Sequence, residues 1–157
     1  MSSRIAIMDH GHIVEVGTPR DIYLHPRSRF AAQFVGLTNI LPVKMTSSEG
    51  SGSARLDASF ASLVCQQAGV GAFPSGAKLV MLVRPENIRL SREPFESATN
   101  AWRGRVESAT FLGECIDCLV RCGDTLIRAR VDPFAEFEPG VEVHLYAPPE
   151  RLSVILE

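Results

Sequence analysis

The sequence predicts a mainly β protein, a small barrel or sandwich preceded by a β-hairpin and two short helices. From Ile40 onward, short apolar stretches alternate with clusters of Gly, Ser and Pro. We count about eight strands at near-regular spacing there, with little helical periodicity, which favours a small barrel or sandwich. With 157 residues, 45% of them apolar, the chain is long enough to bury a core.

The first part of the chain carries different signals. Residues 5–8 and 13–16 flank a Gly-containing turn and are expected to form a hairpin. Thr18, followed by a proline and an acidic residue, is a helix N-cap, and that helix ends before Pro26. A second helix begins at Ser28 and is terminated by Gly36. We therefore expect residues 1–38 to form one unit and residues 39–157 the β domain, with loops at 47–53 and 94–100.

A hairpin over residues 115–131 is the sharpest local prediction. Its two-residue turn, Gly123-Asp124, sets Cys122 opposite Thr125 and fixes every later pair. The same register pairs Asp117 with Arg130, two opposite charges on the outer face. The pairs on the inner face are all apolar or small, namely Val120 with Ile127, Cys118 with Ala129, and Ile116 with Val131. Because both faces agree with the turn, the register is well specified.

Composition and cysteine placement exclude several classes of function. The net charge of −2 supplies no one-signed field for nucleic acid or an anionic membrane. Cys115 and Cys118 would point to opposite faces of a strand, so we interpret the four cysteines as core residues and not as a zinc or redox site. No run approaches the ~18 apolar residues of a membrane span, and no secretory signal pattern opens the chain, so the cytoplasm is the expected location.

Catalytic motifs are not found in the sequence. It has no glycine-rich phosphate-binding loop, no dinucleotide fingerprint and no zinc-protease motif. The four histidines have no ligand partners at metal-binding spacing. A possible basic face is formed by Arg103, Arg105, Arg128 and Arg130. Since only Trp102 could serve as an exposed stacking platform, nucleic-acid binding is disfavoured.

The break Arg84-Pro85-Glu86 has two interpretations. It could simply end a strand, because Pro85 lacks a backbone donor. It could also be a polar corner that contacts another domain or subunit.

The stretch "RIAIMDHGHIVEVGTPRDIYLHPRSRFAAQFVGLTNILP" closely resembles the tail of the nucleotide-binding domain in the ATPase subunits of ATP-binding cassette importers, of the kind serving maltose, polyamine, ferric iron or phosphonate uptake. Further on, "LVRPENIRLS" and "GRVESATFLGE" resemble the transport-associated oligonucleotide-binding-like (TOBE) domain that follows. The family's phosphate-binding loop, signature motif, Walker B carboxylate and switch histidine precede this region and are not present here. The resemblance therefore implies a C-terminal portion of an importer ATPase with an OB-like barrel.

The resemblance implies a non-catalytic regulatory and dimerisation region. It implies no cofactor in this chain, with ATP and magnesium bound elsewhere in the full-length parent. Expected partners are a second copy of the chain, the membrane-spanning subunits of an importer at the inner face of the membrane, and a regulator or small ligand. Candidate interdomain or dimer contacts are Arg84, Pro85, Glu86, Phe111, Leu112, Gly113 and Glu114, with Phe134 and Phe137 as further apolar candidates.

Two expectations stay open. Barrels related to this one bind oxyanions such as molybdate in another branch of the superfamily, so a small-ligand module is the alternative function, although no Ser/Thr-Lys cluster on a defined turn supports it in the sequence. In the family, residues 4–36 finish against a sheet of the ATPase domain. Here we expect this segment to pair with a second chain, dock on the barrel, or fray.

Overall fold

A computed structural model describes residues 3–50, 52–74, 76–96 and 99–157, and it confirms the mainly β class. Two short α-helices, α1 (Pro19–Leu24) and α2 (Arg29–Phe34), accompany the strands. The strands are β1 (Ile5–Asp9), β2 (His12–Gly17), β3 (Asn39–Glu49), β4 (Ser53–Ala58), β5 (Ala61–Gln66), β6 (Leu79–Val83), β7 (Arg89–Ser91), β8 (Ala101–Phe111), β9 (Ile116–Cys122), β10 (Thr125–Val131), β11 (Glu142–Tyr146) and β12 (Ser153–Leu156). Among these residues, no helix is long and apolar enough to cross a membrane.

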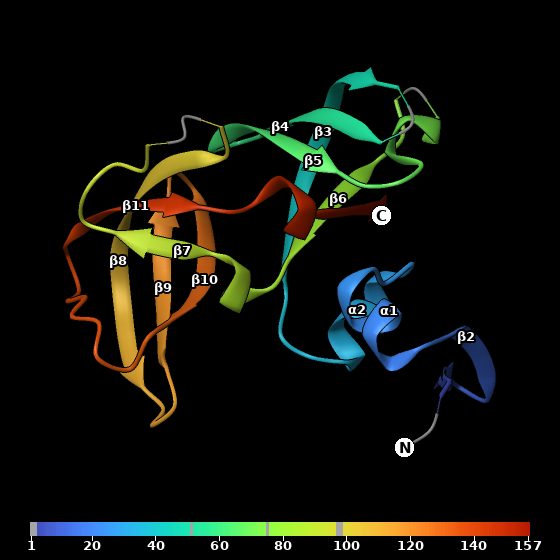
Figure 1. Cartoon of the computed structure of the whole chain (residues 1–157), viewed down its shortest axis with the longest axis horizontal. Coiled ribbons are helices and arrows are strands. Elements are labelled where there is room, and N and C mark those ends of the chain that lie inside the picture. The colour runs from blue at the N-terminus through green and yellow to red at the C-terminus, as the bar shows by residue number, and fades with distance from the viewer. Residues whose placement is uncertain (1–2, 51, 75, 97–98) are drawn as a thin grey trace.

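From β3 onward the strands form two five-stranded antiparallel sheets, seen side by side in Figure 1. One has the order β12-β6-β3-β4-β5 and the other β10-β9-β8-β11-β7. The described residues therefore hold ten strands in this region, more than the eight or so expected from the sequence. One large apolar cluster draws on both sheets, from Leu56 and Met81 in the first to Val120 and Leu145 in the second.

The predicted hairpin register is confirmed pair by pair from Cys122–Thr125 to Ile116–Val131. Its inner-face residues Cys118, Val120 and Ile127 are fully buried, as their alternation predicted. The expected loop at 47–53 is wrong in its first half, because β3 continues through Glu49. A β-bulge between Met45 and Ser47 breaks the two-residue alternation there, which hid the strand from pattern analysis. The loop expected at 94–100 lies partly outside the described residues.

The helices begin where the caps predicted. The side chains of Thr18 and Ser28 accept hydrogen bonds from the backbone N–H groups three residues later, at 3.1 Å each. Ile7 of β1, Ile22 of α1 and Ala31 of α2 form a small apolar cluster against which Phe30 and Val35 pack. Phe34 of α2 stays largely exposed, at 66%.

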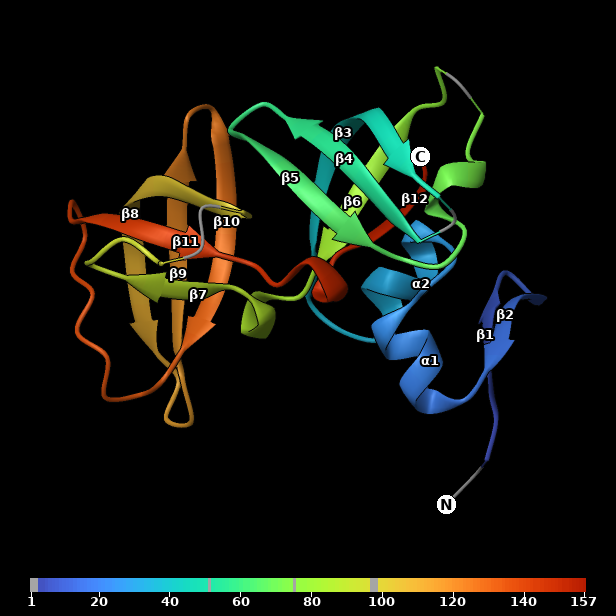
Figure 2. The same ribbon diagram turned by 45° about the horizontal axis from the view of Figure 1, so that its top comes forward.

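The N-terminal segment docks on the first sheet. Ala32 of α2 packs with Val80 and Leu82 of β6 and Ile155 of β12. This contact explains why β6, an apolar run from Leu79 to Val83, is buried on both faces. Figure 2 shows α1 and α2 beside that sheet, with the β1–β2 hairpin on their far side. Of the three expectations for residues 4–36, docking is the one that the structure shows within a single chain.

Candidate functional site

The site is the junction at which the helices meet the two sheets, and Arg84 lies at its centre. β6 ends at Val83 because Pro85 has no backbone donor and starts a turn of 3-10 helix, η2 (Pro85–Asn87). Arg84, between them, is only 5% exposed and turns its guanidinium toward the helices. Burial lowers the pKa of Arg84, and the nearby Tyr23 and Glu86 oppose that shift.

The guanidinium of Arg84 is held by backbone carbonyls. Nη1 lies 2.9 Å from the carbonyl oxygen of Ala32, 2.8 Å from that of Gly36 and 3.0 Å from that of Leu37. Nη2 donates to the carbonyl of Tyr23 at 3.2 Å, and the guanidinium carbon lies 4.4 Å from the centre of the Tyr23 ring. Tyr23 and Ala32 lie in the last turns of α1 and α2, where carbonyls lack partners within the helix, and Gly36 and Leu37 follow α2. One planar cation thus satisfies all four carbonyls.

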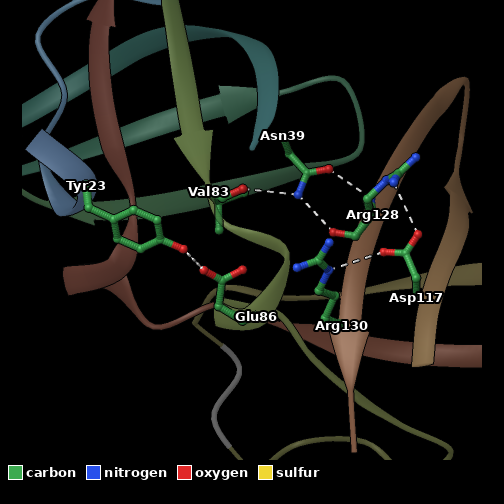
Figure 3. A network of polar contacts seen from close by, with 7 residues as sticks. All are labelled: Tyr23, Asn39, Val83, Glu86, Asp117, Arg128 and Arg130. Atoms are coloured by element: carbon green, nitrogen blue, oxygen red, sulfur yellow. Dashed lines mark hydrogen bonds and ion pairs between the residues drawn. The ribbon is translucent and has the colours of Figure 1, made fainter. Parts of the chain in front are cut away.

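Tyr23 and Glu86 close the same junction from its exposed side. The Tyr23 hydroxyl donates a hydrogen bond to the Glu86 carboxylate, a contact between α1 and η2 shown in Figure 3. Burial raises the pKa of Tyr23, and the hydrogen bond to Glu86 raises it further. Each side chain of the Arg84-Glu86 pair therefore engages Tyr23, one through the ring face and the other through the hydroxyl.

Asn39 joins the two sheets next to this cluster. Its Nδ2 donates to the carbonyls of Val83 at 3.1 Å and Arg128 at 2.9 Å, and its Oδ1 accepts from the N–H of Arg128 at 2.8 Å. The amide thus pairs with the edge strand β10 in the way that a neighbouring strand would (Figure 3).

An ion-pair group on the second sheet completes the junction. Asp117 of β9 lies 3.2 Å from Nη1 of Arg128 and 3.6 Å from Nε of Arg130, both on β10. The predicted pairing of Asp117 with Arg130 is therefore confirmed, and Arg128 adds a second cation. Of the basic face expected from the sequence, Arg105 also has a carboxylate partner, Glu142, at 3.4 Å.

The remaining candidate contacts lie elsewhere. Phe111 and Leu112 are 68% and 51% exposed at the tip of the β8–β9 hairpin, together with Gly113 and Glu114, and do not belong to the core. Figure 1 places this tip at the end of the second sheet, well away from α1 and α2. The structure therefore separates the seven candidates into two groups: the Arg84-Pro85-Glu86 corner at the junction, and an exposed apolar tip. Of the two further candidates, Phe134 is 90% exposed and Phe137 packs against the core.

Sequence reasoning missed the amides that tie strand edges together. Asn100, buried and at φ +58°, exchanges two hydrogen bonds with the backbone of Val64 on β5 and donates a third to the carbonyl of Ala147. Gln67 likewise exchanges two with Val154 on β12. No periodic signal marks such residues, since each acts as a single amide at the end of a strand.

The cysteines form no visible reactive centre. Cys65, Cys118 and Cys122 are buried free thiols, and burial raises their pKa values to about 12, about 11 and about 11. Cys115 is partly exposed. In the part of the chain that the structure describes, no three His, Cys, Asp or Glu residues gather as they would around a metal ion.

Comparison with known proteins identifies the family to which part of the chain belongs. Residues 81–155 match the model of the TOBE domain family. The chain contains a TOBE domain. This TOBE domain includes the Arg84 corner, the β8–β9 tip and the Asp117 ion pairs, whereas α1, α2 and Asn39 precede the matched region. The junction therefore connects the TOBE domain to the segment before it.

Relatives confirm the resemblance to importer ATP-binding subunits. The chain is 33% identical over 96% of its length to the spermidine/putrescine import ATP-binding protein PotA of Acidothermus cellulolyticus, of which it covers 40%. It is 31% identical over 81% of its length to PotA of Thermotoga maritima, of which it covers 34%. The matched region lies in the C-terminal part of these relatives, and the chain spans well under half of their length.

A solved structure shares the fold of about three quarters of the chain. The cytoplasmic molybdate-binding protein ModG, with molybdate bound, superposes with a TM-score of 0.66 at 17% identity, covering 76% of this chain and 96% of ModG. At this identity the likeness supports the OB-like fold alone.

Proposed function

We propose that this chain acts as the regulatory and dimerisation region of the ATP-binding subunit of an ABC importer. The observation that carries the proposal is the Arg84 junction, which ties the segment containing α1 and α2 to the TOBE domain through four backbone carbonyls. A segment held in this way moves together with the sheets. A movement of the ATPase domain that displaces α1 and α2 is thus passed to the TOBE domain as a rigid-body displacement.

In this proposal the chain is not itself catalytic. ATP and magnesium bind elsewhere in the full-length subunit, and the complex sits with the membrane-spanning subunits at the inner face of the membrane. The β1–β2 hairpin and α2 expose large apolar side chains, among them Met8, Ile13 and Phe34, at 53%, 62% and 66%. Such a surface suits contact with the rest of an ATPase domain.

We assign the dimer contact to the β8–β9 tip, where Phe111 and Leu112 are exposed. The test is sedimentation equilibrium of the wild-type chain and of a Phe111→Glu, Leu112→Glu double variant. The proposal expects a wild-type dimer that the double variant converts to monomer. Leu126→Glu, which introduces one negative charge at a 39% exposed apolar position near the other end of the sheet, is the control and should remain dimeric. A monomeric wild type, or a dimer that the tip variant leaves intact, contradicts the assignment.

The alternative is a small-ligand module that binds an oxyanion, as the similarly folded ModG binds molybdate. Titration calorimetry with molybdate, sulfate and phosphate separates the two. Saturable binding of one oxyanion supports the alternative. The absence of binding, together with a dimer that depends on the β8–β9 tip, supports the regulatory and dimerisation role.

A further inference from the structure

A cleft away from the junction runs along an open part of the first sheet. β6 pairs with β3 only from Asn39 to Val43, whereas β4 pairs with the other side of β3 from Val43 to Glu49. On the β6 side, Lys44–Glu49 therefore have no strand partner among the described residues. Backbone groups along such an edge can pair with an added strand.

The cleft beside this edge has the size of a ligand site. Its volume is about 820 Å³, and it is lined on one side by residues 42–48 of β3 and on another by Phe73, Pro74 and residues 76–79. Sites for small ligands occupy about 300–1,000 Å³. Val43 and Leu79 give it an apolar floor, and Ser47 and Ser48, whose side chains point to opposite faces of β3, line it farther along the strand.

Four charged side chains form a row across the sheet at the mouth of this cleft. Asp57 is the cross-strand partner of Lys44. Lys78 precedes Leu79, the partner of Val43, so it stands next to Lys44 on the other side. Glu157 follows in turn, and its N–H donates to the carbonyl of Lys78 at 3.0 Å. The signs across the row are negative, positive, positive, negative.

The two central lysines are adjacent like charges. Side chains of like charge directly opposite each other destabilise a strand pair, and β6 pairs with β3 only from Leu79 onward. Neither ammonium group forms an ion pair within the described residues. A carboxylate placed between Lys44 and Lys78 would relieve their repulsion and complete the alternation of charge.

We propose that an extended acidic segment of a partner protein binds here as an added strand on the free edge of β3, with a carboxylate between Lys44 and Lys78. The open edge supplies backbone pairing, the apolar floor accommodates the inward side chains, and the two lysines select the charge. This proposal does not depend on the role in an importer or on the dimer contact at the β8–β9 tip.

The probe is a fluorescein-labelled ten-residue peptide of alternating Glu and Thr, compared with the Lys and Thr peptide of the same length. Fluorescence anisotropy at low salt should show saturable binding of the acidic peptide alone. Lys78→Glu should weaken binding by roughly tenfold, since charge-assisted contacts to a peptide are lost. Arg103→Glu, an exposed position on the other sheet, makes the same change in net charge and should leave binding within about twofold.

Hydrogen exchange then locates the peptide, with slower exchange expected in residues 44–49. Ser48→Pro, which removes a backbone donor on the side of β3 that faces away from β4, should also weaken binding, and circular dichroism checks that it folds. If it does not fold, Lys78→Glu and the exchange data decide alone. Equal binding of both peptides, no binding of the acidic one, equal losses in Lys78→Glu and Arg103→Glu, or protection elsewhere overturns the proposal. Displacement by an equimolar amount of free glutamate or sulfate also overturns it, because the site would then be one for small anions.

Discussion

Replacing Arg84 with alanine tests whether the junction holds the helices on the sheet. The substitution removes four contacts to the carbonyls of Tyr23, Ala32, Gly36 and Leu37, together with the stacking on the Tyr23 ring. A hydrogen bond to a charged group contributes about 1.5–3 kcal/mol. Three of the four share one nitrogen, and some freed carbonyls will reach water, so we expect a loss of about 3–5 kcal/mol rather than the full sum.

Urea denaturation of the wild type and the variant measures this loss. For a chain of this size it corresponds to a fall in melting temperature of about 6–20 °C, since 1 kcal/mol is worth about 2–4 °C. Arg84→Lys keeps the charge without the planar fork and should give an intermediate loss. Hydrogen exchange should accelerate most in residues 19–37, because these lose the guanidinium directly.

Arg92→Ala is the matched control. Arg92 also donates to a backbone carbonyl, that of Glu136 at 2.9 Å, but it does so at an exposed position. Its loss should cost less than about 1 kcal/mol. If Arg84→Ala costs no more than Arg92→Ala, or if exchange accelerates evenly across both sheets, the junction does not anchor the helices and the reasoning fails.

Three further predictions address the same account. Burial and the hydrogen bond to Glu86 raise the pKa of Tyr23 above 10.0, so the stabilisation that Tyr23 provides is complete below about pH 10 and is lost as the pH rises through the raised pKa. The melting temperature of Tyr23→Phe should therefore fall less steeply above about pH 10 than that of the wild type. Parallel curves of melting temperature against pH would contradict this. A thiol reagent at about pH 8 should label Cys115 quickly and the three buried cysteines only after unfolding. Rapid labelling of all four would show that both sheets open, since Cys65 lies on β5 and Cys118 and Cys122 lie on β9. Asn100→Asp turns two donated hydrogen bonds into carboxylate–carbonyl repulsion and should destabilise by about 3–5 kcal/mol in urea, whereas the partly exposed Asn87→Asp should cost under about 1 kcal/mol.

The features predicted correctly from the sequence are those set by interactions between residues close together in the chain. The register from Cys122–Thr125 onward follows from a two-residue turn, and the helix starts follow from the caps at Thr18 and Ser28. Each of these signals acts within about four residues, so the rest of the chain cannot override it easily. The apolar run of β6 is buried on both faces, and α2 covers the second face.

Long-range features were harder to predict. The sequence singled out Arg84 as a polar corner, but its carbonyl partners lie 47–61 residues away, and any backbone carbonyl can accept. The bulge at Met45–Ser47 disguised the end of β3, and the division of the strands into two sheets depends on which edges meet in space. The charge row at Lys44 and Lys78 became visible only once the registers of four strands were known. The division between residues 38 and 39 stays a prediction, although β3 begins at Asn39.

The mass of the native protein in its source cells tests the central claim most directly. An antibody raised against residues 101–131 would detect it on a denaturing gel of separated membrane and soluble fractions. The account predicts a band more than twice the 17.1 kDa of this chain, recovered with the membrane fraction, because the relatives are longer than this chain by more than that factor. A single band at 17.1 kDa that stays in the soluble fraction would contradict a role as the regulatory region of an importer ATP-binding subunit.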